Sequence, residues 1–221
     1  MRREVTLEEI SDGKLYDAND MVKADCQDCK GCCDCCKGMG DSVLLDPYDV
    51  CRLSRGLQRT PEDLIGNVLE LGISDGNILP HLAMKGAEER CVFLNGEGRC
   101  VVHAIRPGFC RLFGRYYSED GFKYILQIHE CTKKNRSKIK VKKWLDTPNL
   151  KQYEKFIWEW HQFLLDVQEV FYQTEDADLI KNLNMYVLSR FYYKEYDEKK
   201  DFYEQFYERL EEAKKLLSLG V

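Results

Sequence analysis

The chain has 221 residues, enough to bury a sizeable core in one domain, or in one domain with a helical appendage. Hydrophobic residues make up 44% of the sequence and charged residues 32%, which excludes a disordered chain. The formal net charge is -5 at pH 7, so the average field repels nucleic acid and argues against it as a partner.

Eleven cysteines are the most informative feature of the composition. Six of them lie between Cys26 and Cys36, too close together for disulfides that would close loops of useful length. The first residues lack the apolar core of a secretory signal, and no apolar run approaches 18 residues. We therefore expect a cytoplasmic protein with no membrane partner. Thiols stay reduced in the cytoplasm, so the cluster indicates metal ligands before disulfides.

Two helices are predicted directly after the cysteine cluster. Asp46 followed by Pro47 is typical of a helix N-cap and first turn, and the helical spacing of apolar residues continues to about Leu57. Thr60 followed by Pro61 predicts the start of a second, short helix.

Three hairpins are predicted in the middle of the chain. The first turns at Asp75-Gly76, the second runs from Cys91 to His103 around Asn95-Gly96, and the third turns at Asp120-Gly121 before a strand to about Ile128. The register of the second hairpin would bring Cys91 close to Cys100. We expect cysteines at the strand ends to converge on one site.

The composition changes after the last cysteine, Cys131. Residues 133–143 hold seven basic residues in eleven, and the chain from Pro148 onward reads as three helices with aromatic stripes. We predict an N-terminal segment (1–25), a cysteine-cluster metal-binding domain (26–145) and a C-terminal helical extension (146–221). The predicted fold class is α+β, a cysteine-rich core of short hairpins and helices with a C-terminal helical subdomain.

The spacing of the cysteines is that of metal knuckles, in which two residues between thiolates turn the chain so that both sulfurs face one ion. The repeat Cys-x-x-Cys-x-x-Cys-Cys can begin at Cys26 or at Cys29, and neighbouring cysteines are expected to serve two centres, or one centre and the core. His103 and His129 lie close to later cysteines, whereas Cys51, inside a predicted helix, is interpreted as a core residue. Thiolates suit zinc, iron and iron-sulfur clusters, and do not choose among them. The candidate metal ligands are Cys26, Cys29, Cys32, Cys33, Cys35, Cys36, Cys91, Cys100, Cys110 and Cys131.

The order of the motifs resembles the YkgJ family of cysteine-cluster proteins over about residues 26 to 131. The resemblance implies a domain that chelates zinc or iron. A member group, the flagellin lysine N-methylases, further implies an alternative: an enzyme that methylates protein lysine with S-adenosylmethionine and an iron-sulfur centre. Because the repeat is doubled here, either register can be the family's, and the short gap to Val43 favours the one that starts at Cys29. The motifs that carry the resemblance are the cysteine repeat, Val43-Leu44-Leu45-Asp46-Pro47, Cys91-Val92-Phe93-Leu94, Gly98-Arg99-Cys100-Val101-Val102-His103 and Arg106-Pro107-Gly108-Phe109-Cys110-Arg111.

The sequence thus predicts a metal-binding protein first. No glycine-rich nucleotide loop supports the methylase alternative, and no particular protein partner is indicated. The basic run at 133–143 supports a third hypothesis, a patch for RNA or another anionic partner. Ile139, Val141 and Trp144 alternate with its lysines in the manner of a half-exposed strand. Arg106 and Arg111 are expected to donate either to cluster thiolates or to nearby carbonyls, with a buried pair between an arginine and Asp49 as the alternative.

Overall fold

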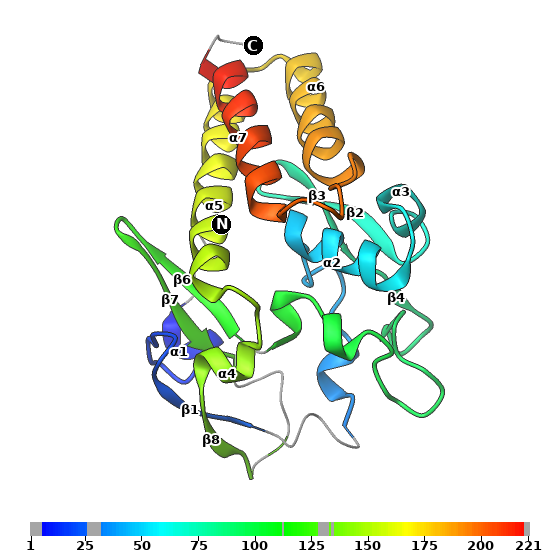
Figure 1. The fold of residues 1–221 in the computed structure, drawn as a ribbon, viewed down its shortest axis with the longest axis vertical. Helices are drawn as coiled ribbons and strands as arrows, with labels where there is room; N and C mark the ends of the chain where they lie inside the picture. The colour runs from blue at the N-terminus through cyan, green and yellow to red at the C-terminus, as the bar shows by residue number, and fades with distance from the viewer. Residues whose placement is uncertain (1–5, 26–31, 112, 128–132, 134, 219–221) are drawn as a thin grey trace. The chain divides into compact units, whose positions relative to one another are not determined.

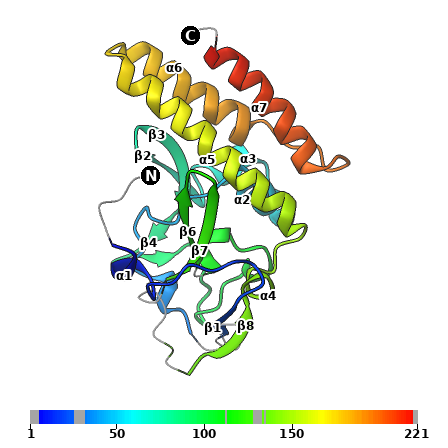
Figure 2. The ribbon, with the colours of Figure 1, turned by 90° about the vertical axis from the view of Figure 1, so that its left-hand side faces the viewer.

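The computed structural model describes residues 6–25, 32–111, 113–127, 133 and 135–218. Backbone contacts divide the chain into two compact units, each made of two segments (Figures 1 and 2). The first unit comprises Met1–Leu44 and Leu82–Leu150, and the second comprises Leu45–His81 and Lys151–Val221. Short antiparallel hairpins and a helical C-terminal region make this an α+β protein, as the sequence predicts. Among the described residues, no helix has the length and apolar character required to cross a membrane.

The first unit is built from short elements joined by turns. β1 pairs with β8, β4 with β5 and β6 with β7, each pair antiparallel. The elements are α1 (Leu7–Ile10), β1 (Met21–Asp25), the 3-10 helix η1 (Asp34–Cys36), β4 (Met84–Lys85), β5 (Arg90–Cys91), the 3-10 helices η2 (His103–Ile105) and η3 (Gly108–Arg111), β6 (Phe113–Ser118), β7 (Gly121–Leu126), β8 (Ser137–Lys140) and α4 (Val141–Leu145).

The core of the first unit joins segments far apart in the sequence. Strand β1 alternates exposed and buried residues, and its buried Val22 and Ala24 pack with Tyr124 of β7 and with Val141 and Trp144 of α4. One apolar face is therefore enough to place the β1–β8 pair over the β6–β7 hairpin, because alternate strand residues share a face.

The predicted hairpins are confirmed at two of three places. β6 and β7 turn between Ser118 and Gly121, and β2 and β3 form the hairpin around Asp75-Gly76. The hairpin predicted from Cys91 to His103 forms only around its turn. There Leu94 and Cys100 form an antiparallel bridge, and the N–H groups of Asn95 and Val101 donate to the carbonyls of Arg99 and Phe93, both at 2.9 Å. The ends of the predicted hairpin do not pair with each other as strands, and β5 pairs with β4.

The side chain of Asn95 explains this difference. Its Oδ1 accepts the backbone N–H groups of Glu97 at 3.0 Å and Arg99 at 2.8 Å. An asparagine that bonds to its own following backbone closes a compact loop and takes those N–H groups away from a strand ladder. A continuous strand through Ile139, Val141 and Trp144 is likewise not formed, since β8 ends at Lys140 and α4 begins at Val141.

The second unit consists of helices and one hairpin. The predicted N-caps are confirmed: Asp46 accepts the N–H of Asp49 at 2.8 Å, and Thr60 accepts that of Asp63 at 3.1 Å. The elements are α2 (Pro47–Leu57), α3 (Pro61–Leu64), β2 (Leu69–Ser74), β3 (Asn77–Leu82), α5 (Leu150–Gln173), α6 (Ala177–Val187), the π-helix η4 (Leu188–Tyr193) and α7 (Phe202–Ser218).

Aromatic side chains form the core of the second unit. Phe156 on α5 meets Phe206 on α7 edge to face with 4.6 Å between ring centroids, and Trp160 lies 5.0 Å from Phe191. Arg209 on α7 donates to the carbonyls of Arg190, Lys194 and Glu195, so it closes the end of the π-helix. The aromatic stripes of the sequence are therefore buried packing faces.

Candidate metal centre

The first unit holds all the candidate ligands that the structure describes. These are Cys32, Cys33, Cys35, Cys36, Cys91, Cys100 and Cys110. Cys26, Cys29 and Cys131, together with His129, lie outside the described residues.

Backbone bonds hold the cysteine segment against β5. The N–H of Cys36 donates to the carbonyl of Cys33 at 2.9 Å, which forms the turn of η1. Directly after this turn, the backbone of Lys37 forms an antiparallel β-bridge with that of Arg90, and the N–H of Gly38 donates to the carbonyl of Glu89 at 3.1 Å. The paired cysteines are thus fixed next to the strand that ends in Cys91.

Cys91 and Cys100 occupy similar turns. The N–H of Leu94 donates to the Cys91 carbonyl at 2.9 Å, and that of His103 donates to the Cys100 carbonyl at 3.4 Å. Burial raises the pKa of both thiols, and in each turn the N–H two residues on, from Phe93 or Val102, donates to the cysteine sulfur and offsets part of that rise. A donor that points at sulfur favours the thiolate, which is the form that binds metal.

The thiols of four separate segments interact with one another. The pKa of Cys36 is raised chiefly by its hydrogen bond with Cys35, then by burial and by the negative charges of Cys110 and Cys91. Burial raises the pKa of Cys91, and the charges of Cys100 and Cys35 raise it further. Like charges in one neighbourhood disfavour ionisation, and a bound cation would remove that penalty.

Cys100 also lies beside a cation. Burial raises the pKa of its thiol, while the guanidinium of Arg106 lowers it. Arg106 is only 7% exposed and donates to Nε2 of His103. The hydrogen bond between them occupies that ring nitrogen, so His103 does not offer it to a metal in this arrangement.

Trp144 connects α4 to the segment that carries Cys110. Its Nε1–H donates to the carbonyl of Arg111 at 2.8 Å, and the Arg106 guanidinium lies 5.8 Å from its ring centroid. Trp144 therefore positions both η3 and the arginine near Cys100. The alternating pattern predicted a strand at Trp144 and gave no indication of this role, although a tryptophan directly after a lysine-rich run was a usable signal.

Arg106 and Arg111 were expected to donate to cluster thiolates or to nearby carbonyls, and the structure shows the surroundings of each. Arg106 acts on Cys100 through its charge and hydrogen-bonds His103, while Arg111 is 2% exposed and offers its carbonyl to Trp144. Asp49 belongs to the second unit, where its carboxylate closes the capping box of α2.

The donor set fits zinc or iron in chemical type. Soft thiolates are the ligands that these metals share. Gly98, at φ +72°, packs against Cys33, whose Sγ would be in ordinary van der Waals contact, at 3.5 Å, with a Cβ at that position. Within the described part of the chain, no three cysteine, histidine or acidic side chains are grouped as closely as the ligands of one ion.

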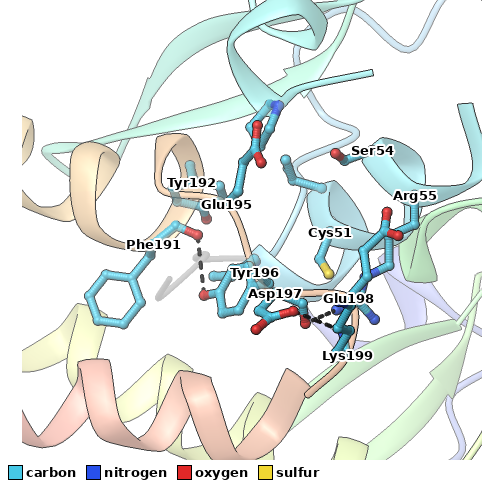
Figure 3. A pocket seen from close by; sticks show the side chains of 13 residues that line it. Cys51, Ser54, Arg55, Phe191, Tyr192, Glu195, Tyr196, Asp197, Glu198 and Lys199 are labelled. Carbon is cyan, nitrogen blue, oxygen red and sulfur yellow. Dashed lines mark hydrogen bonds between the residues drawn. The ribbon is translucent and has the colours of Figure 1, made fainter. Parts of the chain in front are cut away.

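A separate cavity lies in the second unit (Figure 3). It has a volume of about 530 Å³ and is lined by α2, η4 and the loop that follows η4. Cys51 lines it and is 5% exposed, in agreement with its interpretation as a core residue. Burial raises the pKa of its thiol to about 11, so Cys51 stays neutral at physiological pH.

These features define a cysteine-rich domain with the donor chemistry of a metal chelator. Residues 26–152 match the sequence profile of the CxxCxxCC family, described as a putative zinc- or iron-chelating domain. The chain belongs to this family. No curated protein and no solved structure matches it. The family and the number of cysteines together point to a metal ion as the ligand.

Proposed function

We propose that this protein binds zinc or iron through the thiolates of its first unit. The observation that carries the proposal is the interaction among five thiols that come from separate parts of the chain. They are Cys35, Cys36, Cys91, Cys100 and Cys110. Cys91 is buried and the other four are partly buried. Neighbouring thiols with raised pKa values are costly to ionise, and a divalent cation compensates that cost directly.

The remaining cysteines extend this donor set. Cys32 and Cys33 flank η1, and Cys26, Cys29 and Cys131 are further candidates on sequence grounds. We propose that the repeat beginning at Cys29 supplies the knuckle, because its last two cysteines are the ones that interact with Cys91 and Cys110. Surplus thiols leave room for a second centre.

A bound zinc would cross-link the segments, and iron or an iron-sulfur cluster would add one-electron redox chemistry. The chain's own residues prepare the thiols: backbone N–H groups donate to Cys91 and Cys100, and Arg106 offsets negative charge at Cys100. We further propose that the protein works in the cytoplasm, where these thiols stay reduced, and that it is a YkgJ-type member of its family.

Metal analysis of protein purified without oxygen tests the proposal. We expect at least one zinc or iron per chain, and an absorption spectrum that separates colourless zinc from coloured iron-sulfur centres. Cys91→Ser and Cys100→Ser should each lose most of the metal, because each removes a sulfur ligand.

Cys51→Ser is the matched control. Cys51 is also a buried cysteine, but it lies in the second unit and lines the separate cavity. Its variant should keep the metal content of the unaltered protein. Equal metal content in all three variants, or no zinc or iron in the unaltered protein, would refute the proposal.

A further inference from the structure

A lysine-rich face lies on the β1–β8 pair of the first unit. Met21 lies opposite Lys140 and Val22 opposite Ile139, so the inward side chains are apolar and the alternate ones face solvent. We call the exposed lysines of this pair and of the adjoining α4 the basic face. Its members are Lys23, Lys138, Lys140, Lys142 and Lys143.

The fold adds a distant lysine to the lysines that are already close together in the sequence. Lys23 is more than a hundred residues from the others, yet the β1–β8 pairing places its strand beside theirs (Figures 1 and 2). Lys138 and Lys140 project from alternate positions of β8, about 6.8 Å apart along an extended strand. Lys142 and Lys143 continue the basic sequence into the exposed side of α4.

These lysines are not used within the protein. Among the described residues, none of the five forms an ion pair. Two acids close in sequence to Lys23 accept other hydrogen bonds: Ser137 donates to Asp25 at 3.0 Å, and the N–H of Asp17 donates to Asp20 at 2.7 Å. The positive charge of the basic face is therefore presented to solvent.

We propose that the basic face binds the phosphate backbone of a nucleic acid without reading its sequence. Its charges are lysines, which contact phosphate as point charges. Met21, 51% exposed, is its one large apolar side chain among the described residues, too little to anchor the face in a lipid surface. A narrow two-stranded face with a line of lysines fits a linear polyanion.

The net charge of -5 does not prevent this contact. At physiological salt the Debye length is about 8 Å, so remote acids are screened and the local charge decides. Because lysines contact phosphates and carry no sequence information, the affinity should come from counterion release and depend strongly on salt.

Fluorescence anisotropy with a labelled 20-nucleotide RNA of mixed sequence tests the proposal. If the five lysines each contact a phosphate, the affinity should fall about 100-fold between 50 and 200 mM salt. Lys138→Gln/Lys140→Gln removes two contacts, so the fall should shrink to about 20-fold and binding at 50 mM salt should weaken.

Lys151→Gln/Lys181→Gln is the matched control, since it removes two exposed lysines from helices of the second unit. It should bind like the unaltered protein, and circular dichroism should show all variants folded. Absence of RNA binding at 50 mM salt, or equal weakening in both double variants, overturns the proposal. Binding to phosphatidylserine vesicles in place of RNA overturns it as well.

Discussion

Replacing Trp144 by phenylalanine removes the hydrogen bond that ties α4 to η3. The Trp144 Nε1–H donates to the Arg111 carbonyl at 2.8 Å, and Trp144 itself is 6% exposed. Taking a donor from a buried carbonyl costs about 1–3 kcal/mol. The smaller ring also weakens the contact with the Arg106 guanidinium, worth about 0.5–1 kcal/mol. We expect the free energy of unfolding to fall by about 1.5–4 kcal/mol in total, from these two contributions.

Urea unfolding followed by circular dichroism measures this loss on the as-purified protein, and metal analysis of the same samples measures retention. Because Trp144 positions the segment of Cys110, the variant should also hold metal about 10–100-fold more weakly, as other outer-shell changes do. Trp158→Phe is the control, a half-buried tryptophan on α5. Stability of Trp144→Phe within about 0.5 kcal/mol of the unaltered protein would refute this reasoning.

Three further predictions follow from other contacts. Asp46→Ala removes the cap that accepts the Asp49 N–H, so urea unfolding should show a loss of about 0.5–2 kcal/mol, largely restored in Asp46→Ser. Asn184→Ala should destabilise the protein by about 1–3 kcal/mol in the same assay, because Asn184 accepts the N–H of Ile78 at 2.7 Å; a change under about 0.5 kcal/mol would contradict it. The pKa of Cys36 is raised, so its thiol is protonated at neutral pH and must lose a proton to bind metal. Zinc affinity, measured by competition with a chromophoric chelator between pH 6.5 and 8.5 (a range of about two units), should therefore rise with pH; a flat profile would contradict it.

Local signals predicted much of the fold. Asp46-Pro47 and Thr60-Pro61 each start a helix at the predicted residue, because the cap and the proline act on their own backbone. The turns at Asp75-Gly76 and Asp120-Gly121 are confirmed for the same reason. The turn at Asn95-Gly96 is also present, but the strands on either side are shorter than predicted, and the asparagine side chain bonds to the backbone of the loop.

Long-range pairing could not be predicted. β1 and β8 are separated by more than a hundred residues, and neither carries a pattern that selects the other. The grouping of Leu45–His81 with the C-terminal helices is equally hidden, since it depends on packing between distant segments. The spacing of aromatic residues in α5 and α7 predicts that one face of each helix is buried, but it does not predict which element packs against that face.

The candidate site was visible in part. Clustered cysteines indicate metal because of their residue type and spacing, and the structure adds that Cys35, Cys36, Cys91, Cys100 and Cys110 share one electrostatic neighbourhood. The contributions of Trp144 and Arg106 depend on side-chain placement in three dimensions. Composition and spacing alone cannot supply that information.

X-ray absorption at the edge of the bound metal tests the central claim most directly. For a zinc-loaded chain purified without oxygen, the account predicts a first shell dominated by sulfur at about 2.3 Å, as thiolate ligands give. A first shell made only of oxygen and nitrogen, near about 2.0–2.2 Å, would contradict the claim that these cysteines hold the metal.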